Sequence, residues 1–134
     1  NITLRKYSQI ENATDIASVY AESFYQVLKY NVIITDTDKV IACAGTLKKK
    51  YLNQGISDRL TTMIERRDSF VERKKSSIEI TPGLTEYGYY TVAAIINNGD
   101  SIGSVIILSL DTPMLEQEEK LAMILANILS NYFV

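Results

Sequence analysis

The sequence predicts an α+β domain in which an antiparallel sheet is flanked by helices from the two ends of the chain. Three observations lead to this class. An amphipathic helical stripe lies near each end of the sequence, and two pairs of β-branched apolar runs between them are each joined by turn-forming residues. The length, 134 residues, is that of one domain. Helices packed on an antiparallel sheet satisfy this order best.

The first predicted helix covers residues 12–29. Apolar residues recur there at three- and four-residue spacings, which places them on one side of a helix. This stripe consists of Ile16, Val19, Tyr20, Phe24, Val27 and Leu28. Asn12 or Thr14 is a candidate N-cap, because a short polar side chain can accept a hydrogen bond from the first helical turn.

A hairpin follows at residues 31–45, where "NVIITD" and "KVIACAG" are the predicted strands and "TDTDK" forms their connection. Asp36 and Asp38, one residue apart at its tip, raise the alternative of a metal or catalytic pair. A calcium ion, however, requires about six or more converging oxygen ligands, and a hairpin tip offers few. The pattern therefore favours a turn in which an aspartate binds its own backbone.

The next segment predicts a short helical turn that ends at Gly55 and then a helix from Asp58, with Ser57 as its N-cap. Beyond it, "SFVERKKSSIEI" alternates in part like a strand, and "TPGLTEYG" is expected to be an irregular connection. "YYTVAAII" and "SIGSVIILSL" are two strong strands joined by "NNGD", in which Gly99 can adopt a positive φ. Residues 114–134 predict a final helix with its apolar stripe at Leu121, Leu125, Ile128, Leu129 and Tyr132.

The composition excludes several kinds of catalytic and metal site. The sequence contains no histidine, which removes His-based general bases, Ser–His and Cys–His nucleophile pairs and most zinc sites. The net charge of −2 gives no overall attraction to nucleic acid. Cys43 is the single cysteine, and we expect a buried, inert thiol with Ile41 and Gly45 on the same face of its strand. A non-catalytic protein of the reducing cytoplasm, without cofactor, metal or membrane segment, fits this composition.

Nine tyrosines are unusual for this length. A tyrosine offers an apolar ring and one polar tip, which suits a small-molecule pocket and equally an ordinary core edge. If a pocket exists, one sheet face forms its floor and the segment 47–60 its lid, and its apolar walls suit a modest apolar or amphipathic metabolite. Its candidate residues are Ile34 (or Ile33 in the neighbouring register), Cys43, Tyr51, Leu60, Tyr90, Val92, Ala94 and Ile107.

Two strings carry a resemblance to a known family. "NVIITDTDKVIACAGTLKKKYLNQGIS" contains the Asp36-x-Asp38 turn, Gly45, the Lys48-Lys49 pair and Tyr51-Leu52-Asn53, and "YTVAAIINNGDSIGSVIILS" contains a pair of strands joined at Asn98-Gly99-Asp100. In this order and at these spacings they resemble the C-terminal GAF domain of the stage V sporulation protein T family, AbrB-type transcription regulators. The resemblance covers nearly the whole chain.

The resemblance implies a domain division and a set of partners. Residues 1–10 would be the linker or end of a missing AbrB-type DNA-binding domain, and residues 11–134 a GAF-like sensor and oligomerisation domain. DNA would be bound only through the missing domain, and an unknown small molecule would be the effector. The chain would form a dimer, or a tetramer with the DNA-binding domain, through Ile16, Tyr20, Phe24, Val27, Leu121, Leu125, Ile128 and Tyr132. The alternative is a pure assembly module with no ligand.

Overall fold

The computed structural model describes residues 2–67 and 69–133. In chain order its elements are α1 (Ile2–Leu28), β1 (Asn31–Thr35), β2 (Val40–Ala44), α2 (Lys48–Tyr51), α3 (Asp58–Glu65), β3 (Ser69–Thr81), β4 (Leu84–Asn97), β5 (Asp100–Ser109) and α4 (Glu116–Ser130).

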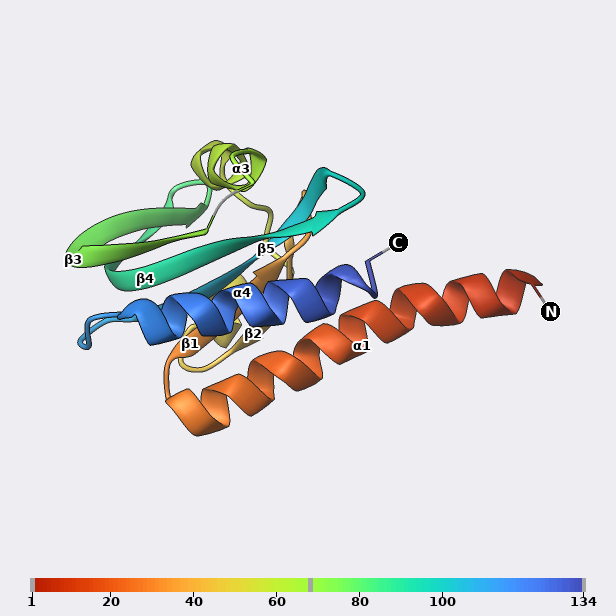
Figure 1. Ribbon diagram of the computed structural model, residues 1–134, viewed down its shortest axis with the longest axis horizontal. Coiled ribbons are helices and arrows are strands. Elements are labelled where there is room, and N and C mark those ends of the chain that lie inside the picture. Colours follow the sequence, from red (N-terminus) through yellow and green to blue (C-terminus); the bar gives the residue numbers. More distant parts are fainter. Residues whose placement is uncertain (1, 68, 134) are drawn as a thin grey trace.

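The strands form one antiparallel sheet in the order β2-β1-β5-β4-β3. The helices α1 and α4 lie side by side on one face of this sheet, and α3 lies on the other face (Figure 1). The short helix α2 packs on the same face as α3. This arrangement confirms the predicted α+β class with a helix from each end of the chain.

The sheet divides the apolar core into two layers. Along β5, Val105 and Ile107 face α1 and α4, whereas Ile106 and Leu108 face α2 and α3. All five residues of β1 are buried as well. The central strands therefore touch both layers, so a displacement on one face reaches side chains on the other through the same backbone.

The predicted hairpin of β1 and β2 is confirmed, with one irregularity. Ile34 pairs with Ala42, but Thr35 pairs with Val40, so Ile41 is an extra residue in β2. Such a bulge turns the side chains on either side of it to different faces. Ile41 accordingly packs in the layer of α1 and α4 and Cys43 in the opposite layer, so the expectation that they share a face was wrong.

Two further expectations differ from the structure. The segment 84–88, expected to be irregular, is the start of β4, since Thr85, Glu86 and Tyr87 all pair with β3 and only the residues around Gly83 turn the chain. The helix α1 begins at Ile2 instead of near residue 12, so the residues before the predicted start are helical as well. This segment contains neither glycine nor proline, the residues that most often stop a helix.

The predicted start of α3 is confirmed. The Ser57 hydroxyl oxygen accepts a hydrogen bond from the Leu60 N–H at 3.1 Å and donates to the Glu79 carbonyl oxygen at 2.6 Å. The first of these bonds caps the helix, and the second ties the cap to β3. Ser57 thus fixes where α3 begins and holds that end of the helix against the edge strand of the sheet.

Candidate functional site

The residues predicted to line one pocket divide between the two faces of the sheet. Cys43, Tyr51, Leu60, Tyr90 and Val92 lie together in the layer between the sheet and α2 and α3, which we call the α3 face.

Three predicted pocket residues lie elsewhere. Ile34 and Ile107 pack under α1 and α4, and Ala94 lines a separate hollow between β4 and α4. The residue that pairs with Cys43 on the α3 face is Ile33. A change of one residue in register exchanges the two faces of a strand, so Ile33, the alternative in the neighbouring register, takes the place of Ile34.

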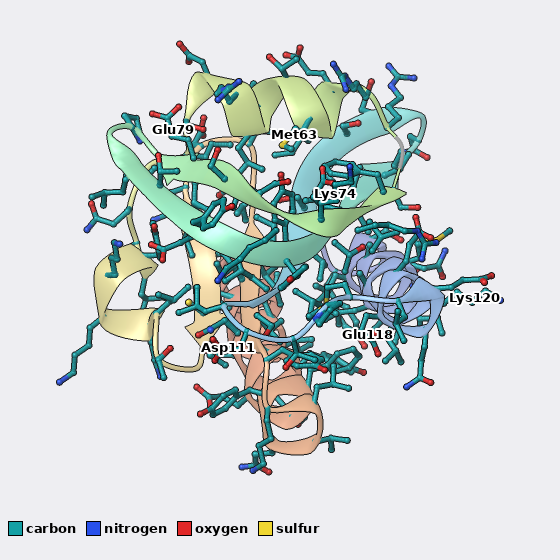
Figure 2. All side chains as sticks on the ribbon, turned by 90° about the vertical axis from the view of Figure 1, so that its left-hand side faces the viewer. Met63, Lys74, Glu79, Asp111, Glu118 and Lys120 are labelled. Carbon is teal, nitrogen blue, oxygen red and sulfur yellow. The ribbon has the colours of Figure 1, made fainter. Side chains whose placement is uncertain are left out.

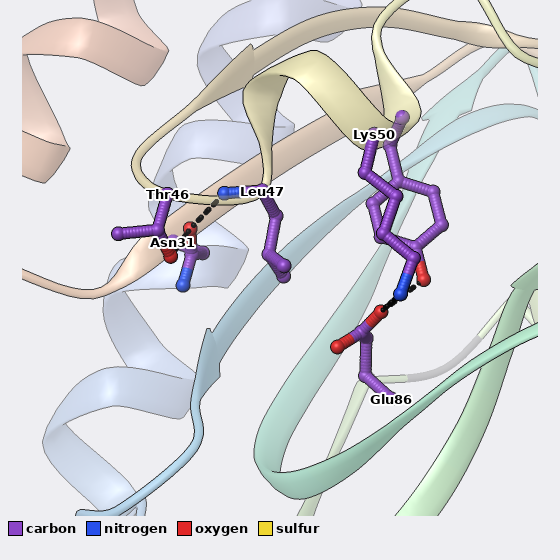
Figure 3. A network of polar contacts seen from close by, with 6 residues as sticks. Asn31, Thr46, Leu47, Lys50 and Glu86 are labelled. Carbon is purple, nitrogen blue, oxygen red and sulfur yellow. Dashed lines mark hydrogen bonds and ion pairs between the residues drawn. The ribbon is translucent and has the colours of Figure 1, made fainter.

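Helix α2 is anchored on its N-terminal side by Asn31. The Asn31 Oδ1 atom accepts a hydrogen bond from the Leu47 N–H at 3.0 Å and from the Thr46 hydroxyl at 3.4 Å (Figure 3). Gly45 makes room for this contact, because its φ is +114° and a Cβ atom there would overlap the Asn31 amide. The turn after β2 is thus built around one amide side chain.

The other end of α2 is anchored by Glu86, a largely buried carboxylate on β4. Glu86 Oε2 accepts a hydrogen bond from the Tyr51 hydroxyl and lies 2.5 Å from Lys50 Nζ (Figure 3). The ammonium balances the carboxylate, and the hydroxyl satisfies the same oxygen, as a buried charge requires. This three-residue cluster closes the α3 face beside α2.

The interior behind this cluster is packed and apolar. Tyr51 and Leu60 are completely buried there. Burial raises the pKa of the Tyr51 hydroxyl, and the hydrogen bond to the Glu86 carboxylate raises it further. Burial also raises the pKa of the Cys43 thiol, to about 12, with a small opposing effect from Lys48. Both groups therefore stay protonated at neutral pH, and Cys43 is not an activated nucleophile.

An open groove lies on the same face, between α3 and the strands β3 and β4. Its volume is about 460 Å³, in the range of small-molecule sites. One wall is the stripe of α3 formed by Arg59, Thr62, Met63 and Arg66, and the other wall is formed by Ser77, Ile78, Glu79 and Tyr90. Figure 2 shows Met63 pointing from α3 toward β3, with Glu79 near one end of the helix. Of the predicted pocket residues, Tyr90 is the one on this lining.

Acidic side chains do not form a metal site in the described part of the chain. Within residues 2–67 and 69–133, no three acidic, cysteine or histidine side chains gather where they could hold a metal ion. Asp36 and Asp38 form a turn, as predicted: Asp36 Oδ1 accepts hydrogen bonds from the backbone N–H groups of Asp38 at 2.7 Å and Lys39 at 2.8 Å. Among the helices of the described chain, none is long and apolar enough to cross a membrane.

The candidate oligomerisation residues fall into three groups. Leu125 is completely buried in the core of the domain, and Ile16, Tyr20, Phe24 and Leu121 are half-buried against that core. Val27 is 82% exposed and Tyr132 is also exposed, whereas Ile128 is half-buried. Three further apolar side chains that the prediction did not include are exposed on these helices: Val19 on α1, and Met123 and Ile124 on α4.

Sequence reasoning left Glu86, Asn31 and the groove arginines out of the site. Glu86 follows from the strand pattern once residues 84–88 are read as β4, because Glu86, Gly88, Tyr90 and Val92 then alternate onto the α3 face. Asn31 had no comparable signal, since it begins a strand whose next three residues are apolar.

Comparison with known proteins identifies the family. The family model described as the C-terminal, transcription-factor part of stage V sporulation protein T matches residues 12–133. The chain belongs to this family. It is also 41% identical over 120 residues to stage V sporulation protein T of Bacillus subtilis (strain 168), an alignment that covers 89% of this chain and 67% of that protein. The resemblance of the two quoted strings is thus confirmed.

Solved structures confirm the GAF fold. The cofactor-binding GAF domain of the nutrient sensor CodY from Clostridium difficile matches with a TM-score of 0.68 and 17% identity, covering 100% of this chain and 99% of that one. The type II free methionine-R-sulfoxide reductase of Thermoplasma acidophilum matches with a TM-score of 0.73 and 16% identity, covering 93% and 94%. At such identities these likenesses concern the fold alone.

Proposed function

We propose that this chain is a non-catalytic, ligand-sensing and oligomerisation domain of a cytoplasmic transcription regulator. In this proposal an effector on the α3 face changes how α1 and α4 pair with those of a second subunit. That change would alter DNA binding by an AbrB-type domain joined to the start of α1.

One observation carries the proposal: the two faces of the sheet are suited to different tasks and share the same strands. The α3 face has an open groove, and the opposite face carries two long helices with exposed apolar side chains. Ile106 and Ile107, adjacent in β5, belong to the two different layers. The first turns of α1 also extend past the sheet (Figure 1). A domain that precedes α1 in the chain would be attached at this end.

The proposal that the chain is non-catalytic rests on the chemistry of its side chains. The thiol of the single cysteine is buried and protonated, which does not suit it to sulfoxide reduction of the kind that the Thermoplasma acidophilum protein performs. The chain also has no histidine to act as a general base.

A second candidate, a pure assembly module without a ligand, is favoured by the packing of Tyr51. Its completely buried ring occupies the interior under α2 and α3, where a GAF ligand would otherwise have room. In this case α1 and α4 would still mediate assembly, while the α3 face would only support the fold.

Native mass spectrometry of the purified chain, followed by the same measurement under denaturing conditions, separates these functions. A dimer with a small adduct that is lost on denaturation supports sensing, and a dimer without one favours the assembly module. Replacing both Val19 and Val27 by Asp should shift the dimer to monomer. The matched control is Tyr87→Asp, an exposed aromatic on β4, which should leave assembly unchanged. A monomeric wild-type chain would contradict assembly through α1 and α4.

A further inference from the structure

We propose that the groove between α3 and β3 binds a small organic carboxylate that has an apolar body. This inference rests on the proposed sensing function and names the chemical class of its effector. It places the ligand outside the packed interior, in a space bounded by one wall of α3 and by the edge of the sheet.

The helical wall supplies the cations. Arg59, Thr62, Met63 and Arg66 follow one another at spacings of three, one and three residues, which places them on one side of α3. Arg66 caps the C-terminal end of the helix, and Arg59 lies in its first turn. The seven-residue separation of Arg59 and Arg66 spans about 10 Å of helix. Two extended arginine side chains can cover this distance, so both guanidinium groups can reach one ligand beside Met63.

The opposite wall supplies apolar surface in a fixed position. The Tyr90 hydroxyl donates a hydrogen bond to the Ser77 carbonyl oxygen at 3.2 Å, and its ring packs edge to face on Phe70 with centroids 6.1 Å apart. Ile78 and Met63 line the same groove. The two contacts hold the Tyr90 ring in place, so an apolar ligand body meets a preformed surface, which lowers the entropy cost of binding.

The charges on the lining favour an anion. On the lining itself two guanidinium groups accompany one carboxylate, that of Glu79, while Glu72, which pairs with Tyr90, lies just outside it. Neither Arg59 nor Arg66 forms an ion pair with a described residue. The Glu79 Oε2 atom accepts a hydrogen bond from the Gly83 N–H at 3.0 Å, which draws it toward the β3–β4 turn. The charged donors in the groove therefore belong to arginine, whose planar fork matches a carboxylate in a bidentate geometry.

The test is a titration of the isotopically labelled chain with three ligands of equal length: hexanoate, hexanamide and hexylamine. We expect hexanoate to shift the backbone amide resonances of α3 and β3 around the groove in a saturable manner. Hexanamide should bind at least tenfold more weakly, because it lacks the charge, and hexylamine should produce no saturable shift. Arg59→Gln and Arg66→Gln should each weaken hexanoate binding at least fivefold.

Arg73→Gln is the matched control, since Arg73 is an exposed cation on β3 outside the lining, and it should bind hexanoate as the wild type does. Equal binding of hexanamide and hexanoate, or preference for hexylamine, would overturn the carboxylate assignment. Shifts confined to the surroundings of Tyr51 and Cys43 would overturn this site but leave the sensing proposal standing. Groove binding that never changes assembly or DNA affinity would support the site and overturn the sensing function.

Discussion

Tyr51 and Glu86, 35 positions apart in the sequence, are joined by a hydrogen bond from the Tyr51 hydroxyl to the Glu86 carboxylate. The bond connects α2 to β4 across the α3 face, and Lys50 supplies the counter-charge on the same oxygen. Asn31 holds the opposite end of α2. The segment over this face is therefore fixed at two points by polar contacts as well as by apolar packing.

The first prediction concerns this connection. Tyr51→Phe keeps the ring but removes the donor, leaving a buried carboxylate with Lys50 alone. A hydrogen bond to a charged group is worth about 1.5–3 kcal/mol, so we expect the free energy of unfolding in urea to fall by about that amount. Tyr87→Phe, at an exposed position on β4 next to Glu86, should change the free energy of unfolding by less than about 0.5 kcal/mol. Equal effects of the two substitutions would contradict a stabilising role for the Tyr51–Glu86 bond.

The second prediction concerns pH and Cys43. The pKa of this thiol rises from 9.0 to about 12 in the folded chain because it is buried. Above pH 9 the unfolded chain loses the proton while the folded chain keeps it, so stability falls as the pH rises from 9 toward 12. One titrating group contributes about 1.4 kcal/mol per pH unit in this window and nothing well below pH 9.

Urea unfolding of the wild type and of Cys43→Ala at pH 8, 9, 10 and 11 measures this contribution. Cys43→Ala should be less stable at pH 8, because a cavity replaces the thiol, but its stability should fall less steeply above pH 9. Groups that do not interact with Cys43 titrate equally in both proteins and cancel in the difference. The Cys43 charge also raises the pKa of Tyr51, so the comparison is made with Tyr51→Phe present in both proteins. Parallel curves for the two proteins would show that the Cys43 pKa is not raised.

The sequence was informative where a pattern has one physical solution. The hairpin of β4 and β5 was predictable because Asn98 and Gly99 adopt positive φ, which few residues do readily, and Ser57 was predictable as a cap for a similar reason. The face of each strand was not predictable. Ile33 and Ile34 are both completely buried, so alternation of apolar and polar residues gives no orientation, and the bulge at Ile41 reverses the facing of part of β2.

The site was less predictable than the fold because its contacts join distant segments. Glu86 lies in a stretch with glycine and proline nearby, and only pairing with β3 makes that stretch a strand. Nothing in the sequence around Arg59 and Arg66 distinguishes them from ordinary solvated helix residues. Their role as one wall of a groove depends on where Ser57 attaches α3 to β3.

The third prediction concerns the turn at Asp36. Asp36→Ala removes the acceptor of two backbone N–H groups and should lower the free energy of unfolding by about 0.5–1.5 kcal/mol. Asp36→Asn keeps a side-chain oxygen at the same place and should cost less than about half of that. The control is Asp38→Ala, at the exposed neighbouring acid, with an expected change within about 0.5 kcal/mol. Added CaCl₂ should not change the unfolding temperature of either the wild type or Asp36→Asn. A rise in the wild type that Asp36→Asn loses would support the metal-pair interpretation instead.

The fourth prediction concerns Gly103, where β5 passes close to β1. A Cβ atom at this position would overlap the Thr35 carbonyl oxygen, which is backbone and cannot move aside as a side chain would. Next to it, the hydroxyl oxygens of Thr35 and Ser104 lie 2.8 Å apart in a buried hydrogen bond. Gly103→Ala must therefore separate the two strands locally, and overpacking of this kind typically costs about 1–3 kcal/mol.

Gly55→Ala is the matched control for Gly103→Ala. The nearest atom to an added Cβ at Gly55 is the Asp38 carbonyl oxygen at 3.7 Å, an ordinary contact, and the φ of Gly55 is not in the left-handed region. Its free energy of unfolding in urea should stay within about 0.5 kcal/mol of the wild type. If Gly103→Ala were equally mild, β1 and β5 would have to be further apart than the structure places them. The packing of β1 against β5 at Thr35, the end of a strand pair whose residues contribute to both core layers, would then be looser than the sensing proposal assumes.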